Sequence, residues 1–202
     1  MLSKSIFSIS HFIFILTIVI SLIALRRRSF LEKLMFSPYH VIHKNRWYLL
    51  LTSGLVHGDF MHLFFNMLTF YFFAFDLAYA VGEINFFIIY ILSLILSHLP
   101  TLIRHKDNYY YRSLGASGAI SGILFSSILI YPTNRIMFFP IPIPIPSAIF
   151  GVIYLLWCKF ADRRIDDGIN HSAHFAGAIV GIIVSFILFP EEIIMIWQNF
   201  LM

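Results

Sequence analysis

Long apolar stretches recur from one end of this chain to the other, and they restrict its possible folds more than any other feature. The six stretches cover residues about 7–25, 60–80, 84–103, 114–131, 147–160 and 172–189. Most are close to the roughly 20 residues that a helix needs to cross the hydrocarbon core of a bilayer, and the fifth is shorter. The pattern therefore predicts an all-α membrane protein with six transmembrane helices.

The composition agrees with a lipid environment. Of the 202 residues, 59% are hydrophobic and only 12% are charged, and the mean hydropathy is +0.85. A soluble domain of this length could not hide so much apolar surface. Because the connections between the stretches are short, residues 1–202 are expected to form a single membrane domain. Cys158 is the only cysteine, which excludes an intrachain disulfide.

Three connecting features refine this picture. The first apolar stretch ends in Arg26-Arg27-Arg28 rather than in a small-residue cleavage site, so a retained helix is expected and not a signal peptide. Segment 26–57 mixes apolar, aromatic and charged residues, and is expected to lie partly helical in the membrane interface. Alternating prolines from Pro140 to Pro146 predict a stiff, extended connector, after which Ser147 is expected to cap the fifth helix.

The motif Gly115-Ala116-Ser117-Gly118 places a serine between glycines where the fourth apolar stretch begins. A backbone N–H at a helix N-terminus favours a developing oxyanion, and the two glycines allow a substrate backbone to approach closely. These features favour a nucleophilic serine. The alternative is that Gly118 and Gly122 form only a small-residue packing face between helices.

His174 is followed by Gly177 and Gly181, which lie on the same stripe of the last helix. If this stripe packs against the glycines that follow Ser117, the imidazole comes within hydrogen-bond reach of the serine hydroxyl, as a general base must. His171 lies one turn earlier and is the rival base. Its position near the loop predicts a solvated side chain instead.

His62 and Asn66 are four residues apart and therefore share one face of the second helix. A polar side chain at membrane depth indicates a functional site, because leaving it unpaired in lipid is costly. Neutral donors here could stabilise the oxyanion of a tetrahedral intermediate, where losing one donor typically costs about 3 kcal/mol of barrier. The alternative is a hydrogen bond that only holds helices together.

Taken jointly, three motifs resemble the rhomboid family of intramembrane serine proteases, over residues about 46–189. They are His57-Gly58-Asp59-Phe60-Met61-His62-Leu63-Phe64-Phe65-Asn66-Met67, Gly115-Ala116-Ser117-Gly118 and His174-Phe175-Ala176-Gly177-Ala178-Ile179-Val180-Gly181. The resemblance implies that Ser117 is the nucleophile and His174 the base of a dyad without a carboxylate. It also implies that His62, Asn66 and the Ser117 amide form the oxyanion hole, within a rhomboid-like six-helix bundle.

The resemblance further implies the partners and the location. Membrane-anchored proteins would be cut in or near their transmembrane segments, within the lipid bilayer, by a multi-pass protein of a bacterial plasma membrane. Acyl transfer by a serine, a histidine and water needs no cofactor. No metal is expected, since no His-Glu-x-x-His zinc motif occurs. Nucleic acid is not expected as a partner. The alternative is a catalytically inactive relative that binds client helices, against which the presence of both Ser117 and His174 argues.

Two points separate this sequence from the simplest family pattern. Some members carry an aromatic residue four positions after the nucleophile; here that residue is Ser121, so a roomier pocket is expected. Every lysine and arginine except Lys4 and Arg135 falls on the side of the membrane that Ser117 faces. The positive-inside rule places that side in the cytoplasm, whereas rhomboid relatives commonly open to the outside, so both orientations stay open.

Overall fold

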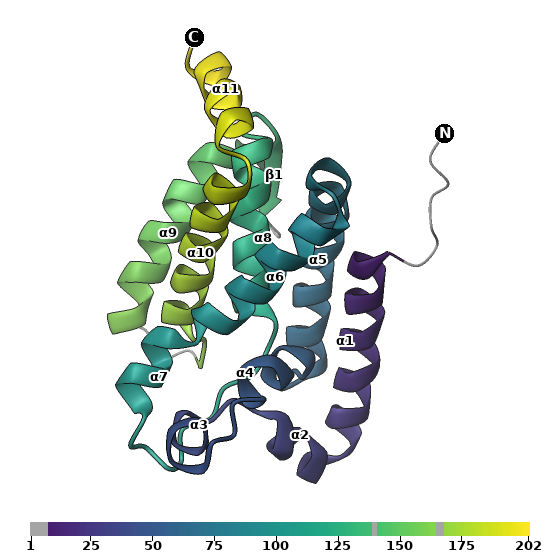
Figure 1. Ribbon diagram of the computed structural model, residues 1–202, viewed down its shortest axis with the longest axis vertical. Helices are drawn as coiled ribbons and strands as arrows, with labels where there is room; N and C mark the ends of the chain where they lie inside the picture. The colour runs from purple at the N-terminus through teal and green to yellow at the C-terminus, as the bar shows by residue number, and fades with distance from the viewer. Residues whose placement is uncertain (1–7, 139–140, 165–167) are drawn as a thin grey trace.

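The structure is a computed structural model that describes residues 8–138, 141–164 and 168–202, and these residues are mainly helical (Figure 1). Within them, four helical stretches are long and apolar enough to cross a membrane. They are α1 (Ile9–Arg26), α5 (Phe60–Val81), the stretch Glu83–His105 that contains α6 (Glu83–Ser97) and α7 (Leu99–His105), and α10 (His171–Leu188). Two further helices, α8 (Ser117–Ile130) and α9 (Ser147–Arg164), also fall on predicted stretches. The total of six crossings stays a prediction, because α8 is short and α9 ends in charged residues.

The helix α8 lies in the interior of the bundle, in contact with α5, α6, α9 and α10 (Figure 1). Its residues from Gly118 to Leu129 are all buried. At 1.5 Å per residue, its 14 residues extend over about 21 Å, which is less than the roughly 30 Å of a bilayer core. A helix this short cannot reach both membrane surfaces, so at least one of its ends lies below a surface.

Glycines bring α8 into backbone contact with α10. A Cβ added to Gly177 would collide with the carbonyl group of Gly118, and one added to Gly181 would collide with the backbone of Gly122. A Cβ on Gly118 would collide with the Ser97 side chain of α6. The three helices therefore pack closely around one another, which is the packing that small residues permit in membranes.

The connection between α1 and α5 is partly helical, as expected, and it gathers at the end of the bundle opposite the C-terminus (Figure 1). It contains α2 (Arg28–Leu34), α3 (Pro38–Lys44), α4 (Leu49–Thr52) and the 3₁₀ turn η1 (Ser53–Leu55). Phe36 exchanges two backbone hydrogen bonds, of 2.9 and 3.1 Å, with Ser113. The loop that leads to Ser117 is thereby tied to this connection.

The proline-rich connector forms one strand of a short antiparallel hairpin made of β1 (Arg135–Phe138) and β2 (Ile141–Pro146); Pro140 lies outside the described residues. Its extended conformation follows from the proline φ angle, but the pairing was not anticipated, because proline supplies no N–H to a ladder. The Ser147 hydroxyl donates to the carbonyl oxygen of Tyr131 at 2.7 Å. The Ser147 side chain thus connects the start of α9 to the end of α8, whereas it was expected to cap α9 itself.

A final helix, α11 (Pro190–Leu201), follows α10 and lies outside the six predicted stretches. Its Trp197 indole N–H donates to the Leu129 carbonyl oxygen at 3.1 Å. Carbonyl oxygens in the last turn of a helix have no N–H donor within that helix, so Trp197 of α11 supplies a donor to one of those at the end of α8.

Candidate active site

Ser117 is the first residue of α8, and the loop in front of it is fixed by Gly115. This glycine has φ 112°, which L side chains rarely adopt, and a Cβ there would lie 2.8 Å from the His62 ring. The Gly115 N–H donates to the Ser53 carbonyl oxygen at 2.9 Å. Because the first N–H groups of a helix have no acceptor within it, those of Ser117 and Gly118 can serve an incoming oxyanion.

The structure brings Ser117 and His174 into contact, with 2.7 Å between the serine Oγ and the histidine Nε2. His174 lies in the first turn of α10, where Asn170 caps the helix by accepting the Ala173 N–H at 3.1 Å. The Gly177 and Gly118 backbones touch one turn further along and fix the spacing of the two helices. A contact of this length is what proton transfer from serine to imidazole requires.

His62 and Asn66 lie on α5, near this pair. The His62 ring packs against Gly115, and its backbone N–H is capped by Asp59 at 2.8 Å. The side-chain N–H of Asn66 donates to the His62 carbonyl oxygen at 2.9 Å, and its buried Oδ1 has no hydrogen-bond partner among the described residues. One N–H of the Asn66 amide is used within α5, which leaves the second for another acceptor.

His57 hydrogen-bonds to the loop in front of Ser117, a contact that the motif alone did not predict. Its Nδ1 lies 2.8 Å from the Ser21 hydroxyl, which donates its single proton to the Leu55 carbonyl oxygen at 2.9 Å. The imidazole must therefore carry its own proton on Nδ1 and keep a lone pair on Nε2. That Nε2 accepts the N–H of Ala116, the residue before Ser117, over 3.5 Å.

Burial dominates the electrostatics of His57. The side chain is fully buried, and desolvation lowers its pKa from 6.5 to about 3, with the neighbouring His62 as a smaller cause. It is therefore neutral at physiological pH. The two imidazole rings meet edge to face, with 4.9 Å between their centroids.

Ser121 occupies the position at which a roomier pocket was expected, and its side chain is in contact with a neighbouring helix. Its hydroxyl lies 2.9 Å from the Tyr154 hydroxyl of α9. An aromatic ring thus approaches this part of α8 from a neighbouring helix and not from α8 itself. Sequence spacing on one helix cannot reveal such a contact.

The expectation that His171 is solvated is wrong. Only 5% of this residue is exposed, and its ring centroid lies 6.1 Å from that of His174. Asn170 turns the chain into α10 at this point, so the histidine faces the bundle and not the loop. The serine hydroxyl is nevertheless bonded to His174.

Comparison with known proteins identifies the family of this chain. The rhomboid domain family matches residues 44–191. "Rhomboid protein 1, mitochondrial" of Saccharomyces cerevisiae is 30% identical over 65% of this chain and 39% of its own length. "Putative rhomboid protease YdcA" of Bacillus subtilis is 28% identical over 75% of this chain and 72% of its own length. "Rhomboid protease AarA" of Providencia stuartii is 26% identical over 73% and 58%, respectively.

The matched segments span between 39% and 72% of these relatives, so the likeness concerns the membrane domain and not their full lengths. The family match includes all three motifs, from His57 to Gly181. It confirms the resemblance inferred from those motifs, and the apolar helices agree with an integral membrane protein. The chain belongs to the rhomboid family.

Proposed function

We propose that this protein is an intramembrane serine endopeptidase in which Ser117 is the nucleophile and His174 the general base. The observation that carries the proposal is the 2.7 Å contact between the serine Oγ and the histidine Nε2. A serine hydroxyl is a weak nucleophile until a base removes its proton. A polar pair of this kind between two apolar helices has a clear use in peptide hydrolysis.

The reaction follows from the two groups. His174 takes the Ser117 proton as Oγ attacks the scissile carbonyl carbon, and then returns that proton to the leaving amine. Water enters next, the imidazole takes one of its protons, and the acyl–enzyme ester is hydrolysed. The serine leaves this second step with its proton restored, so each cycle consumes one water and requires no cofactor.

The oxyanion in both tetrahedral intermediates needs donors, and three are proposed. The Ser117 N–H lies at the start of α8, and the side chains of His62 and Asn66 lie on α5 beside the loop before the serine. Each such donor is typically worth about 3 kcal/mol of the barrier. Gly115 supports this arrangement by its backbone conformation. Gly118, Gly177 and Gly181 support it by allowing the close packing of α8 and α10.

The proposed setting is a single membrane domain over residues 1–202 with six crossings, acting on membrane-anchored proteins in or near their transmembrane segments. Nucleic acid has no part in this chemistry. The bacterial plasma membrane is the proposed location, supported by the relatives from Bacillus subtilis and Providencia stuartii. Mitochondrial relatives match as well, so fractionation of the native host is the test of this point.

The test of the activity is cleavage of a single-span reporter by the purified chain in lipid. Wild-type protein should cut the reporter, and Ser117→Ala should not. Ser127→Ala is the matched control, because it makes the same change on a buried serine near the other end of α8. An inactive, client-binding protein would retain the reporter without cutting it, and would do so equally in all three forms; that result would overturn the proposal.

A further inference from the structure

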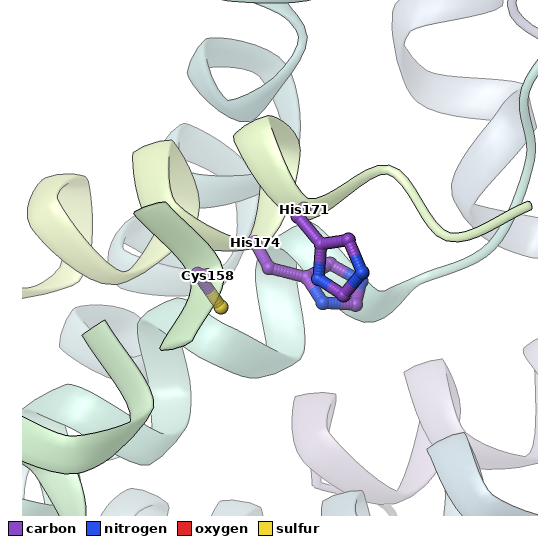
Figure 2. Close-up of side chains that lie close together, drawn as sticks. All are labelled: Cys158, His171 and His174. Atoms are coloured by element: carbon purple, nitrogen blue, oxygen red, sulfur yellow. The ribbon is translucent and has the colours of Figure 1, made fainter. Parts of the chain in front are cut away.

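The one cysteine of this chain lies beside the two histidines at the start of α10. The Cys158 sulfur and one ring nitrogen from each of His171 and His174 all lie within 4.8 Å of one another. Figure 2 shows the sulfur on α9 and the two imidazole rings on α10 gathered in one place. Twelve residues separate the cysteine from the first histidine in the sequence, so no short linear motif indicates this cluster.

Helix geometry explains why the three groups meet. His171 and His174 are three residues apart and share one face of the first turn of α10. Cys158 and Ala161 are likewise three residues apart on α9, and both are almost fully buried. The side of α9 that they mark faces the bundle, where α9 contacts α10. The cluster is therefore set by two helices and not by a loop.

A thiolate with two imidazoles is the ligand set that zinc prefers. Zinc binds sulfur at about 2.3 Å and imidazole nitrogen at about 2.0–2.1 Å, and tetrahedral ligands at those lengths stand about 3.5 Å apart. The observed spacing of up to 4.8 Å has to close by little more than 1 Å, within reach of small side-chain rotations. Hard cations such as Mg²⁺ and Ca²⁺ prefer oxygen ligands, which this cluster does not offer.

We propose that Cys158, His171 and His174 form a site for Zn²⁺, and that an ion bound there inhibits the peptidase. On binding, the thiol releases its proton to solvent, each neutral imidazole donates one lone pair, and a water completes the coordination. The binding of zinc is independent of the proposed function, whereas the inhibition rests on it. The proposal departs from the expectation of no metal, which considered motifs within single helices.

Inhibition follows whichever ring nitrogen of His174 binds the ion. A neutral imidazole has one lone pair, because its other nitrogen carries a proton. If the metal binds Nε2, it displaces the Ser117 hydroxyl that lies there. If it binds Nδ1, the remaining proton resides on Nε2, which can no longer accept one from the serine. Either way the base is lost while zinc is bound.

Binding is tested on the full chain in detergent with Co²⁺ as a spectroscopic probe, which replaces zinc in such sites. Wild-type protein should show a thiolate-to-cobalt charge-transfer absorption that added Zn²⁺ removes. The absorption should vanish in Cys158→Ser and weaken in His171→Asn. It should persist in His43→Asn, the matched control, because His43 pairs with Asp107 away from the cluster. No absorption in wild type, or an unchanged one in Cys158→Ser, would overturn the site.

Inhibition is tested separately on reporter cleavage, titrated with ZnCl₂ and then with a chelator. Cys158→Ser should retain the basal rate, and its inhibitory zinc concentration should rise on the order of tenfold or more, since even supporting groups of metal sites change affinity 10–100-fold. Chelation should restore the wild-type rate. Equal zinc sensitivity of the two proteins would overturn the inhibitory site. Absence of cleavage without zinc would instead overturn the proposed function and leave the cobalt result standing.

Discussion

The Nδ1 of His57 lies 2.8 Å from the hydroxyl of Ser21, so one polar pair joins the loop in front of α5 to the middle of α1. The other nitrogen of the same ring accepts the N–H of Ala116. One neutral imidazole thus connects the first helix of the bundle with the residue that precedes Ser117. Any change in its protonation state breaks one of the two hydrogen bonds.

The stability of the protein should therefore depend on pH through His57. Its pKa is about 3 when folded and 6.5 when exposed, so between these values the unfolded chain binds a proton that the folded chain does not. Stability should fall as the pH falls through this range, with a limiting slope near 1.4 kcal/mol per pH unit. His57→Gln should flatten the slope of unfolding free energy between pH 7 and pH 5. The exposed His43→Gln serves as control, and an unchanged slope in His57→Gln would contradict the assignment.

Ser117 and His174 should behave as one unit in kinetics. Ser117→Ala and His174→Ala should each abolish reporter cleavage, and the double variant should lose little more, because neither group works without the other. Rates of all three variants, measured on one reporter, form a double-mutant cycle. If the two losses in activity simply multiplied, the dyad would have to be abandoned.

The rival histidine should matter less. His171→Ala should retain substantial cleavage, because the serine hydroxyl is bonded to His174 and the two imidazole centroids are 6.1 Å apart. His174→Ala provides the comparison in the same assay. An inactive His171→Ala together with an active His174→Ala would transfer the role of base to His171.

Close packing at Gly177 should be indispensable. Its Cβ would strike the Gly118 carbonyl group, so Gly177→Ala should separate α10 from α8, destabilise the protein by about 1–3 kcal/mol and lower the cleavage rate. Gly151→Ala on α9 is the control, since its Cβ would meet only the end of the Ile128 side chain, at 3.2 Å, and ring atoms of Phe125. Thermal unfolding and cleavage are measured for both. A fully active, equally stable Gly177→Ala would show that this contact does not set the Ser117–His174 distance.

Substrates should need a locally unstable helix. The amides of a regular helix are hydrogen-bonded and its carbonyls are screened, so a scissile bond reaches Ser117 only where the span unwinds. A reporter span with Gly and Pro near the Ser117-side interface should be cut faster than an all-Leu span of equal length. Measuring both at the same density in the same liposomes makes the comparison direct. Equal rates would exclude helix instability as the recognised feature.

The sequence could predict whatever depends on periodicity within one helix. The stripe of His174, Gly177 and Gly181 needs only the 3.6-residue repeat, and the structure shows its glycines in contact with α8. The family assignment came from short motifs in a fixed order, and the family match confirms it. The span expected at 84–103 corresponds to the apolar stretch Glu83–His105, in which a turn at His98 separates α6 from α7.

Contacts between helices were harder to predict. The rotation of α9 about its axis decides whether Cys158 faces lipid or protein, and apolar residues occur all around this helix, so the sequence does not fix that rotation. The burial of His171 depends on where α10 begins. If the start of the helix is misplaced by one turn, a buried histidine is predicted to be solvated. The role of His57 requires Ser21, which is 36 residues away in the sequence, so only the folded structure joins them.

The close contacts of Gly118 with Ser97 of α6 and with Gly177 of α10 have a consequence for motion. Since α6 and α10 each touch the backbone of α8, none of the three can shift by an ångström without a steric clash or an open void. They form a rigid unit that holds Ser117 and His174, the proposed nucleophile and base, in a fixed alignment. If the protein is the proposed peptidase, the movement that admits a polypeptide must come from helices outside this rigid unit, such as α5 and α9, whose larger side chains can change rotamer. Opening of the site and alignment of the site are thus assigned to different parts of the same small bundle.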